Sequence, residues 1–183
     1  MLASLKTRAE IRRKAGEIYG AIVTQARQPD FYSALGIADT PGGRYEMVVL
    51  HLFLVLERLR TAPSAAPALP RLLVEAFIAD MDDSLREMGT GDLAVPKKVR
   101  RAAAGLYERS MHYRGALSAG DEKALASALG KHAHVGGVVN EASRTLATYV
   151  HRAAQLLASQ DEAAMLAGQL EFPPVSAAVE ELP

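Results

Sequence analysis

Histidine is the first residue type in this sequence that could bind a metal ion or move a proton. The chain has five histidines, namely His51, His112, His132, His134 and His151. Two ligands on one helix share a face when they lie three or four residues apart. His132 and His134 are two residues apart, so they could bind one ion only where the chain is irregular, as Gly136 and Gly137 would permit. The spacing favours solvated or capping histidines, and we predict no metal site.

Three neighbouring carboxylates, Asp80, Asp82 and Asp83, are the second candidate for chemistry. Paired acids can transfer protons. They can also bind metal in helical bundles with two iron ions, but those bundles use Glu-x-x-His motifs, and no Glu-x-x-His occurs here. If Met81 faces the core, Asp82 and Asp83 lie outside it or at its flank, with Asp80 beside the apolar stripe. The pattern favours a solvated acidic face over an active site.

Signatures of catalysis are missing from the sequence. There is no cysteine, which excludes a thiol nucleophile, a disulfide and a thiolate zinc site. No nucleophile–His–acid signature, phosphate loop or dinucleotide fingerprint occurs, and Gly89 and Gly91 follow an expected helix, which indicates a turn. We predict a protein that is not an enzyme, with no catalytic residue and no cofactor.

The formal net charge of zero hides opposed blocks of charge. Residues 1–27 hold six basic and two acidic side chains, residues 75–92 hold six acidic and one basic, and residues 94–115 hold six basic and one acidic. Such blocks can steer a charged partner or pair with one another in the fold, and the sequence leaves both open. Neutrality argues against a general nucleic-acid binder, and we predict no readout of nucleic-acid sequence.

Nearly every segment has the alanine-rich composition and apolar periodicity of a helix. The expected helices span about residues 5–28, 41–61, 71–88, 96–118, 121–132, 138–159 and 161–168. Pro29 ends the first, residues 31–37 form a hydrophobic connector, Gly89 closes the third and Asp92 could cap the fourth. We predict an all-α fold, a single irregular bundle of about six or seven helices.

The domain organisation follows from the same pattern. Residues 1–172 are expected to form one domain, with a Pro/Ala linker at residues 61–70 inside it, and residues 173–183 a loose acidic tail. The apolar stretch 47–56 is about half the ~20 residues that a membrane-spanning helix needs. The basic N-terminus has no apolar region typical of a secretory signal. These features favour a cytoplasmic protein.

Several strings of the sequence resemble the ubiquinol–cytochrome c chaperone family. The resemblance begins with residues 19–27 (YGAIVTQAR), 31–40 (FYSALGIADT), 43–47 (GRYEM) and 50–56 (LHLFLVL). Its most specific block is residues 77–97 (FIADMDDSLREMGTGDLAVPK). The resemblance spans about residues 17–118 and extends more loosely to the expected helix at residues 138–159.

The resemblance implies an all-α assembly factor for the cytochrome bc1 complex, whose client is newly made apo-cytochrome b or another bc1 subunit. It also implies a small co-chaperone and contact with the ribosome or the periphery of the inner membrane, on the matrix side in a eukaryote. The acidic helix, the turn and the start of the basic helix form the expected client or partner surface. Its residues are Asp80, Asp82, Asp83, Arg86, Glu87, Asp92, Lys97, Lys98 and Arg101. The same stretch could instead be a hydrogen-bonded determinant of the fold.

Two other classes of function stay open from the residues alone. A lipid- or hydrophobic-ligand-binding protein would use the central apolar helix to line a cavity. An adaptor that contacts the ribosome or RNA would use the basic stretch at residues 97–101, although few aromatic residues accompany it.

Overall fold

The computed structural model describes residues 2–63, 66–133 and 139–176, which form helices joined by short connections. Six helices have twelve residues or more, and two have five residues each. The helices are α1 (Leu2–Ala26), α2 (Pro29–Ser33), α3 (Pro41–Arg60), α4 (Leu69–Glu87), α5 (Val95–Ala119), α6 (Glu122–Ala133), α7 (Glu141–Ser159) and α8 (Glu162–Leu166). No strand occurs in these residues, so the all-α class and the irregular bundle are confirmed.

Local signals in the sequence set most helix ends. Thr40 precedes Pro41, and its side-chain oxygen accepts a hydrogen bond from Gly43 N at 3.2 Å, so α3 begins with a side-chain cap and a proline in its first turn. Gly120 adopts the left-handed conformation directly after α5, with φ of 63°. The main difference from expectation is α2, a single helical turn that includes the start of the expected connector.

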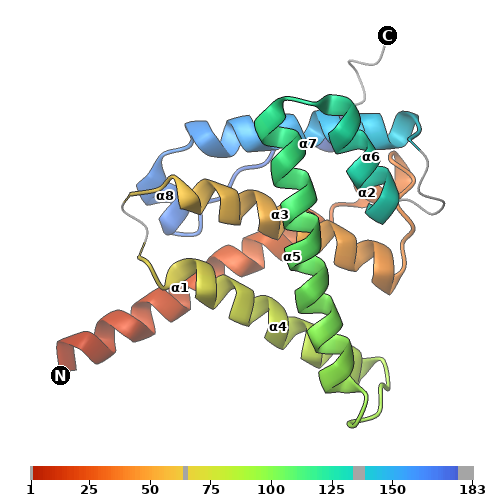
Figure 1. The fold of residues 1–183 in the computed structure, drawn as a ribbon. Helices are drawn as coiled ribbons and strands as arrows, with labels where there is room; N and C mark the ends of the chain where they lie inside the picture. The colour runs from red at the N-terminus through yellow and green to blue at the C-terminus, as the bar shows by residue number, and fades with distance from the viewer. Residues whose placement is uncertain (1, 64–65, 134–138, 177–183) are drawn as a thin grey trace.

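The helix α3 is the centre of the bundle. Figure 1 shows it between α7 and α4, with α5 crossing in front of it, and it packs against α1 and α6 as well. Its residues 46–55 are all buried, on every face of the helix. A helix that is apolar on all faces is stable only when neighbours cover it on all sides.

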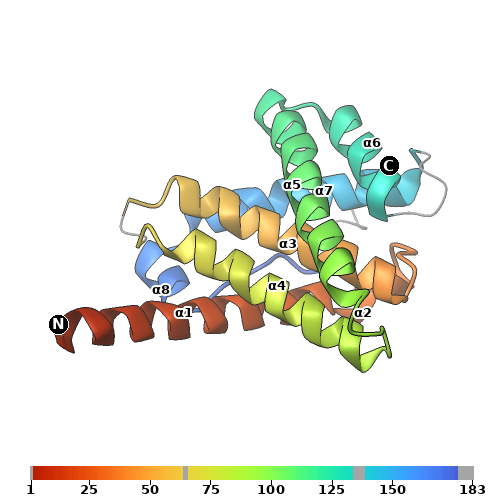
Figure 2. The same cartoon turned by 60° about the horizontal axis from the view of Figure 1, so that its bottom comes forward.

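The remaining helices cover α3 in two groups. The helices α1 and α4 pack on each other, α5 packs on α4, and α5, α6 and α7 form consecutive contacts. Figure 2 shows the N-terminal part of α1 extending beyond the rest of the bundle. No helix in the described part of the chain combines the length and the apolar character needed to cross a membrane.

Two expected irregular segments fall partly outside the described residues. In the expected linker 61–70, Ala62 is buried, Leu69 begins α4 and is also buried, and residues 64–65 are not described. In the expected acidic tail, Val175 is only 2% exposed and belongs to the core, whereas residues 177–183 are not described. The core therefore extends past residue 172, where the sequence placed the end of the domain.

Candidate functional site

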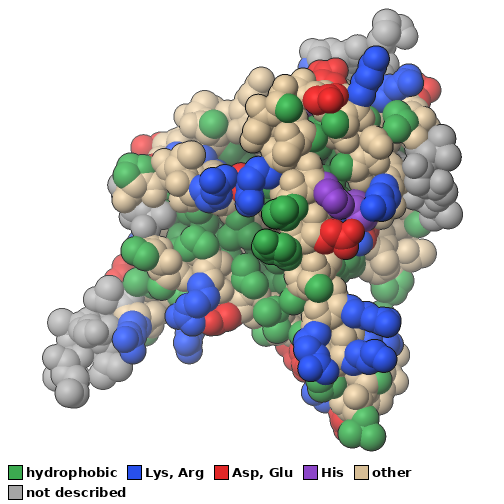
Figure 3. All heavy atoms as spheres, in the orientation of Figure 1, with side chains coloured by type: hydrophobic (Ala, Val, Ile, Leu, Met, Phe, Trp, Pro, Cys, Tyr) green, Lys and Arg blue, Asp and Glu red, His purple; other side chains and the backbone are tan. Residues whose placement is uncertain are grey.

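The second half of α4, the turn after it and the start of α5 form a hairpin that carries the expected site residues, with Asp92 in the turn itself. Leu93, in this turn, is 99% exposed, and Met88, which follows α4, is 53% exposed. Figure 3 shows basic side chains gathered around the end of the α5 helix that carries this turn. Exposed apolar patches with a polar rim are typical of surfaces that bind another protein, so this hairpin is a candidate contact surface.

Three of the expected site residues pair with one another. Arg86 donates from Nε to Asp82 Oδ2 and from Nη1 to Asp92 Oδ1, both at 2.6 Å. Asp92 was expected to cap α5, and this expectation is wrong, because the cap position is Ala94 and makes no side-chain cap. The long side chain of Arg86 brings its guanidinium to both carboxylates and so joins the turn to the end of α4. These residues shape the turn.

A groove beside the hairpin brings together three other expected residues. Asp80, Glu87 and Lys98 line it, and its volume is about 490 Å³. We call it the α4 groove, because α4 and its cap supply six of its lining residues: Asp80, Met81, Ser84, Leu85, Glu87 and Met88. The other lining residues are Arg27, Pro41, Arg44, Tyr45, Val48, Lys98 and Ala102. Asp83, Lys97 and Arg101 are exposed but do not line it.

The charged side chains of the α4 groove differ in how they are held. Asp80 accepts a hydrogen bond from the Tyr19 hydroxyl at 2.7 Å, which ties α4 to α1. Burial and this hydrogen bond raise the pKa of Tyr19, so the phenol stays protonated. Lys98 Nζ donates to Thr90 Oγ1 at 3.0 Å. Glu87 is exposed and has no hydrogen-bond or ion-pair partner among the described residues, so it can accept one from a bound molecule.

Sequence reasoning missed two arginines of this site. Arg27 and Arg44 line the α4 groove and also a neighbouring hollow of about 590 Å³. Arg44 Nε donates to Asp39 Oδ1 at 2.6 Å, and this hydrogen bond holds the pKa of Asp39 below its usual value. Both arginines lie in strings that carried the family resemblance, and that was the available signal. The α4 groove therefore carries basic side chains from α1 and α3 as well as the acidic Asp80 and Glu87 of α4.

Beneath the groove, a buried ion pair fixes the crossing of α3 and α5. Arg109 donates from Nε and Nη2 to the two carboxylate oxygens of Glu46, each at 2.6 Å, and Glu46 is 8% exposed. Burial raises the pKa of Glu46, although the hydrogen bonds from Arg109 oppose that rise. The Arg109 guanidinium also lies 5.5 Å from the centre of the Tyr45 ring. Tyr45 in turn donates to Ala102 O on α5 at 3.0 Å.

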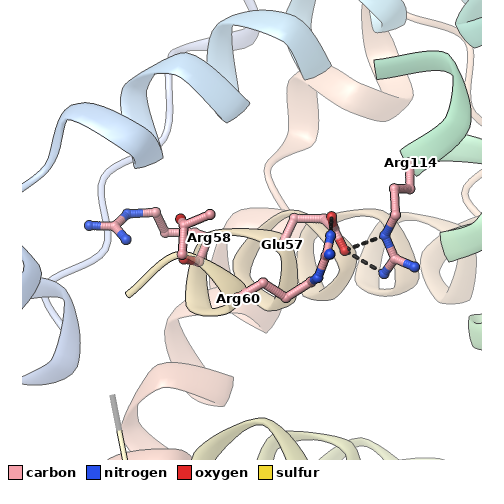
Figure 4. A network of polar contacts seen from close by, with 5 residues as sticks. Glu57, Arg58, Arg60 and Arg114 are labelled. Carbon is pink, nitrogen blue, oxygen red and sulfur yellow. Dashed lines mark hydrogen bonds and ion pairs between the residues drawn. The ribbon is translucent and has the colours of Figure 1, made fainter. Parts of the chain in front are cut away.

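A second ion-pair network holds the other half of α5 on α3. Figure 4 shows Arg114 reaching from α5 to Glu57 on α3, which also pairs with Arg60. Burial alone would raise the pKa of Glu57, but the hydrogen bonds from Arg114 and Arg60 outweigh it and lower that pKa. Arg58 Nε donates to Leu157 O at 2.8 Å and so ties the same end of α3 to α7. These contacts fix the C-terminal end of α3 against α5 and α7.

Comparisons with known proteins agree with this architecture. The family model for the ubiquinol-cytochrome C chaperone matches residues 33–172. The crystal structure of the Cbp3 homolog from Brucella abortus is similar to this chain with a TM-score of 0.80 and 34% identical residues. That similarity covers 96% of this chain and 98% of the Brucella chain. A comparison with curated proteins gives no match.

Proposed function

Because the chain belongs to the ubiquinol-cytochrome C chaperone family, we propose that it is a non-catalytic assembly chaperone of the cytochrome bc1 complex. It captures newly made apo-cytochrome b, or another bc1 subunit, without a cofactor or turnover. The α4 groove is the contact site for this client. The observation that carries the proposal is the juxtaposition, in one open groove, of apolar side chains with charges of both signs.

The lining of the groove suits a protein segment with both apolar and charged residues. Met81 and Met88 supply flexible apolar surface, which adapts to clients of different shape. Arg27 and Lys98 can pair with acidic client residues, and Glu87 with a basic one. These contacts hold an apolar client segment away from water until its own partners arrive, and the release requires no covalent step.

A matched pair of charge reversals on α4 tests the proposal. Glu87→Lys reverses a charge that lines the groove, whereas Asp83→Lys makes a comparable reversal at an exposed position outside it. We expect Glu87→Lys to reduce the amount of cytochrome b or other bc1 subunits recovered with the tagged protein from the native membrane fraction. Asp83→Lys should leave that recovery near the wild-type level. Equal recovery with both variants would remove the α4 groove from the mechanism.

Photo-crosslinking gives a second test of the groove. A photoreactive amino acid at position 88, in the groove, should form a crosslink to a bc1 subunit that mass spectrometry identifies. The same amino acid at position 107 serves as a control, because Tyr107 is 70% exposed and does not line the groove. Crosslinks to a bc1 subunit from position 107 alone would move the client site to the outer face of α5.

The two other classes of function lead to different results in the same preparation. The groove volume lies within the usual range of about 300–1,000 Å³ for small-molecule sites, so native mass spectrometry should be used to look for a stoichiometric lipid. Exposed Lys97, Arg100 and Arg101 carry the adaptor hypothesis, which predicts ribosome or RNA binding that weakens steeply with salt. The same purification shows whether a small co-chaperone accompanies the chain. The fraction from which the chain is recovered shows whether the chain is cytoplasmic or lies at the membrane periphery.

A further inference from the structure

Two helices of the bundle bring together a carboxylate and two imidazoles. Glu108 and His112 lie one helical turn apart on α5, and His132 lies near the end of α6. One ligand atom from each residue lies within 4.8 Å of the others. The two histidine rings are nearly parallel, at an interplanar angle of 15°, with their centres 5.9 Å apart. Figure 3 shows histidine side chains gathered at the surface beside α5, with acidic side chains next to them.

The Nε2 atom of His132 has no partner that would explain its burial. It is shielded from solvent and makes no hydrogen bond in the described structure. Buried polar atoms normally pair with protein, water or an ion, because leaving one unpaired costs roughly 1–3 kcal/mol.

The charges around the cluster are compatible with a cation. Glu108 is exposed and supplies a negative charge, and His112 is exposed on the same face. Two positive charges, those of Arg109 and Lys131, also act on His132, and Arg109 is held by two hydrogen bonds to Glu46. Lys131 is exposed, so water screens its charge.

We propose that Glu108, His112 and His132 bind a Zn²⁺ ion that joins α5 to α6. Two imidazoles and one carboxylate form an established ligand set for zinc, in which water occupies the fourth position. The three ligand atoms lie within 4.8 Å of one another, and side-chain rotation must bring them closer to share one ion. From the sequence we predicted no metal site and considered only His132 with His134 as a pair, and His134 lies outside the described residues.

Zinc titration of the untagged protein tests this proposal. The protein is stripped with a chelator, dialysed and titrated with ZnCl₂ in a calorimeter, and the melting temperature is followed in parallel. We expect one ion per chain and a rise in melting temperature that the chelator reverses. Glu108→Gln, His112→Asn and His132→Asn should each weaken Zn²⁺ binding by at least about tenfold, the loss caused by removing even an outer partner of a ligand.

The variants are chosen so that failure to fold does not hide the answer. Glu108 and His112 are exposed, so their replacement should leave the circular dichroism spectrum unchanged. Glu122→Gln and His151→Gln remove the same residue types outside the cluster and should bind Zn²⁺ as the wild type does. Absence of saturable binding to the wild type, or equal affinity in wild type and cluster variants, would overturn the proposal.

Discussion

The Tyr149 hydroxyl lies 2.7 Å from Nε2 of His51, and this hydrogen bond joins α7 to α3 inside the core. His51 is fully buried, and its Nδ1 donates to Met47 O at 2.7 Å. Nε2 is therefore the acceptor, and Tyr149 donates to it. Gln25 Nε2 on α1 donates to the same hydroxyl oxygen at 3.1 Å. The chain of hydrogen bonds connects three helices and leaves His51 neutral.

The buried imidazole predicts a loss of stability in mild acid. Burial lowers the pKa of His51 to about 4, against about 6.5 in the unfolded chain. Since the unfolded state takes up the proton first, the free energy of unfolding is highest above pH 6.5 and falls as the pH drops toward 4. This group alone should account for roughly 3 kcal/mol of that loss. Urea unfolding at several pH values measures it, and in His51→Gln the loss should be smaller by that amount.

The Tyr149 hydroxyl itself can be tested by a single-atom deletion. Tyr149→Phe leaves a buried acceptor on His51 and a donor on Gln25 without their partner, so we expect a loss of about 1–3 kcal/mol in unfolding free energy. Tyr107→Phe is the matched control, because Tyr107 is 70% exposed. Equal stability of the two variants would show that the hydrogen bond contributes nothing.

The Glu46–Arg109 pair should behave as a buried ion pair. Arg109→Ala leaves the Glu46 carboxylate buried without a counter-charge, and we expect a loss of about 3–5 kcal/mol. Arg71→Ala breaks a pair whose side chains are 70% and 47% exposed, and it should cost less than about 1 kcal/mol. Chemical unfolding at neutral pH compares the two, and a small effect of Arg109→Ala contradicts the role of this pair in fixing α5.

Two glycines of α5 should respond in opposite ways to alanine. A Cβ at Gly105 would lie 2.4 Å from the Tyr45 hydroxyl and 2.9 Å from Arg109 Nη1, so Gly105→Ala must displace both side chains. We expect it to cost about 1–3 kcal/mol, as overpacking does. Gly115 has no atom within 4 Å of such a Cβ, and Gly115→Ala should stabilise the helix by about 1 kcal/mol. Thermal unfolding of the two variants tests the close approach of α3 and α5.

A second matched pair tests the basic side of the α4 groove. Lys98→Glu reverses the charge of a residue that lines the groove. Lys97→Glu reverses the charge of the neighbouring residue, which is exposed but does not line the groove. Client recovery should fall with Lys98→Glu alone if acidic client residues enter the groove. If Lys97→Glu has the stronger effect, the exposed basic surface is the contact, as the adaptor hypothesis requires.

Helix positions could be predicted from the sequence because their signals act within one turn of the chain. Pro41 at the start of α3 fixes φ, and Gly89 after α4 permits the positive φ of 77° found there, without help from distant residues. The expected cap at Asp92 also depended on neighbouring residues only, but it did not form. The Asp92 carboxylate instead accepts a hydrogen bond from the charged Arg86. Predictions from local signals were therefore correct where no long side chain from another turn bound the residue concerned.

The sequence by itself determined the all-α class, the central apolar helix, and the acidic helix with the turn after it, because periodicity and charge order are properties of neighbouring residues. Only the tertiary structure decided which charges face a common groove, since Arg27, Arg44 and Lys98 come from separate parts of the chain. The same holds for His112 and His132, whose rings meet through the packing of α5 on α6. Spacing along one helix says nothing about residues that a helix crossing brings together, because that crossing depends on the packing of the whole core.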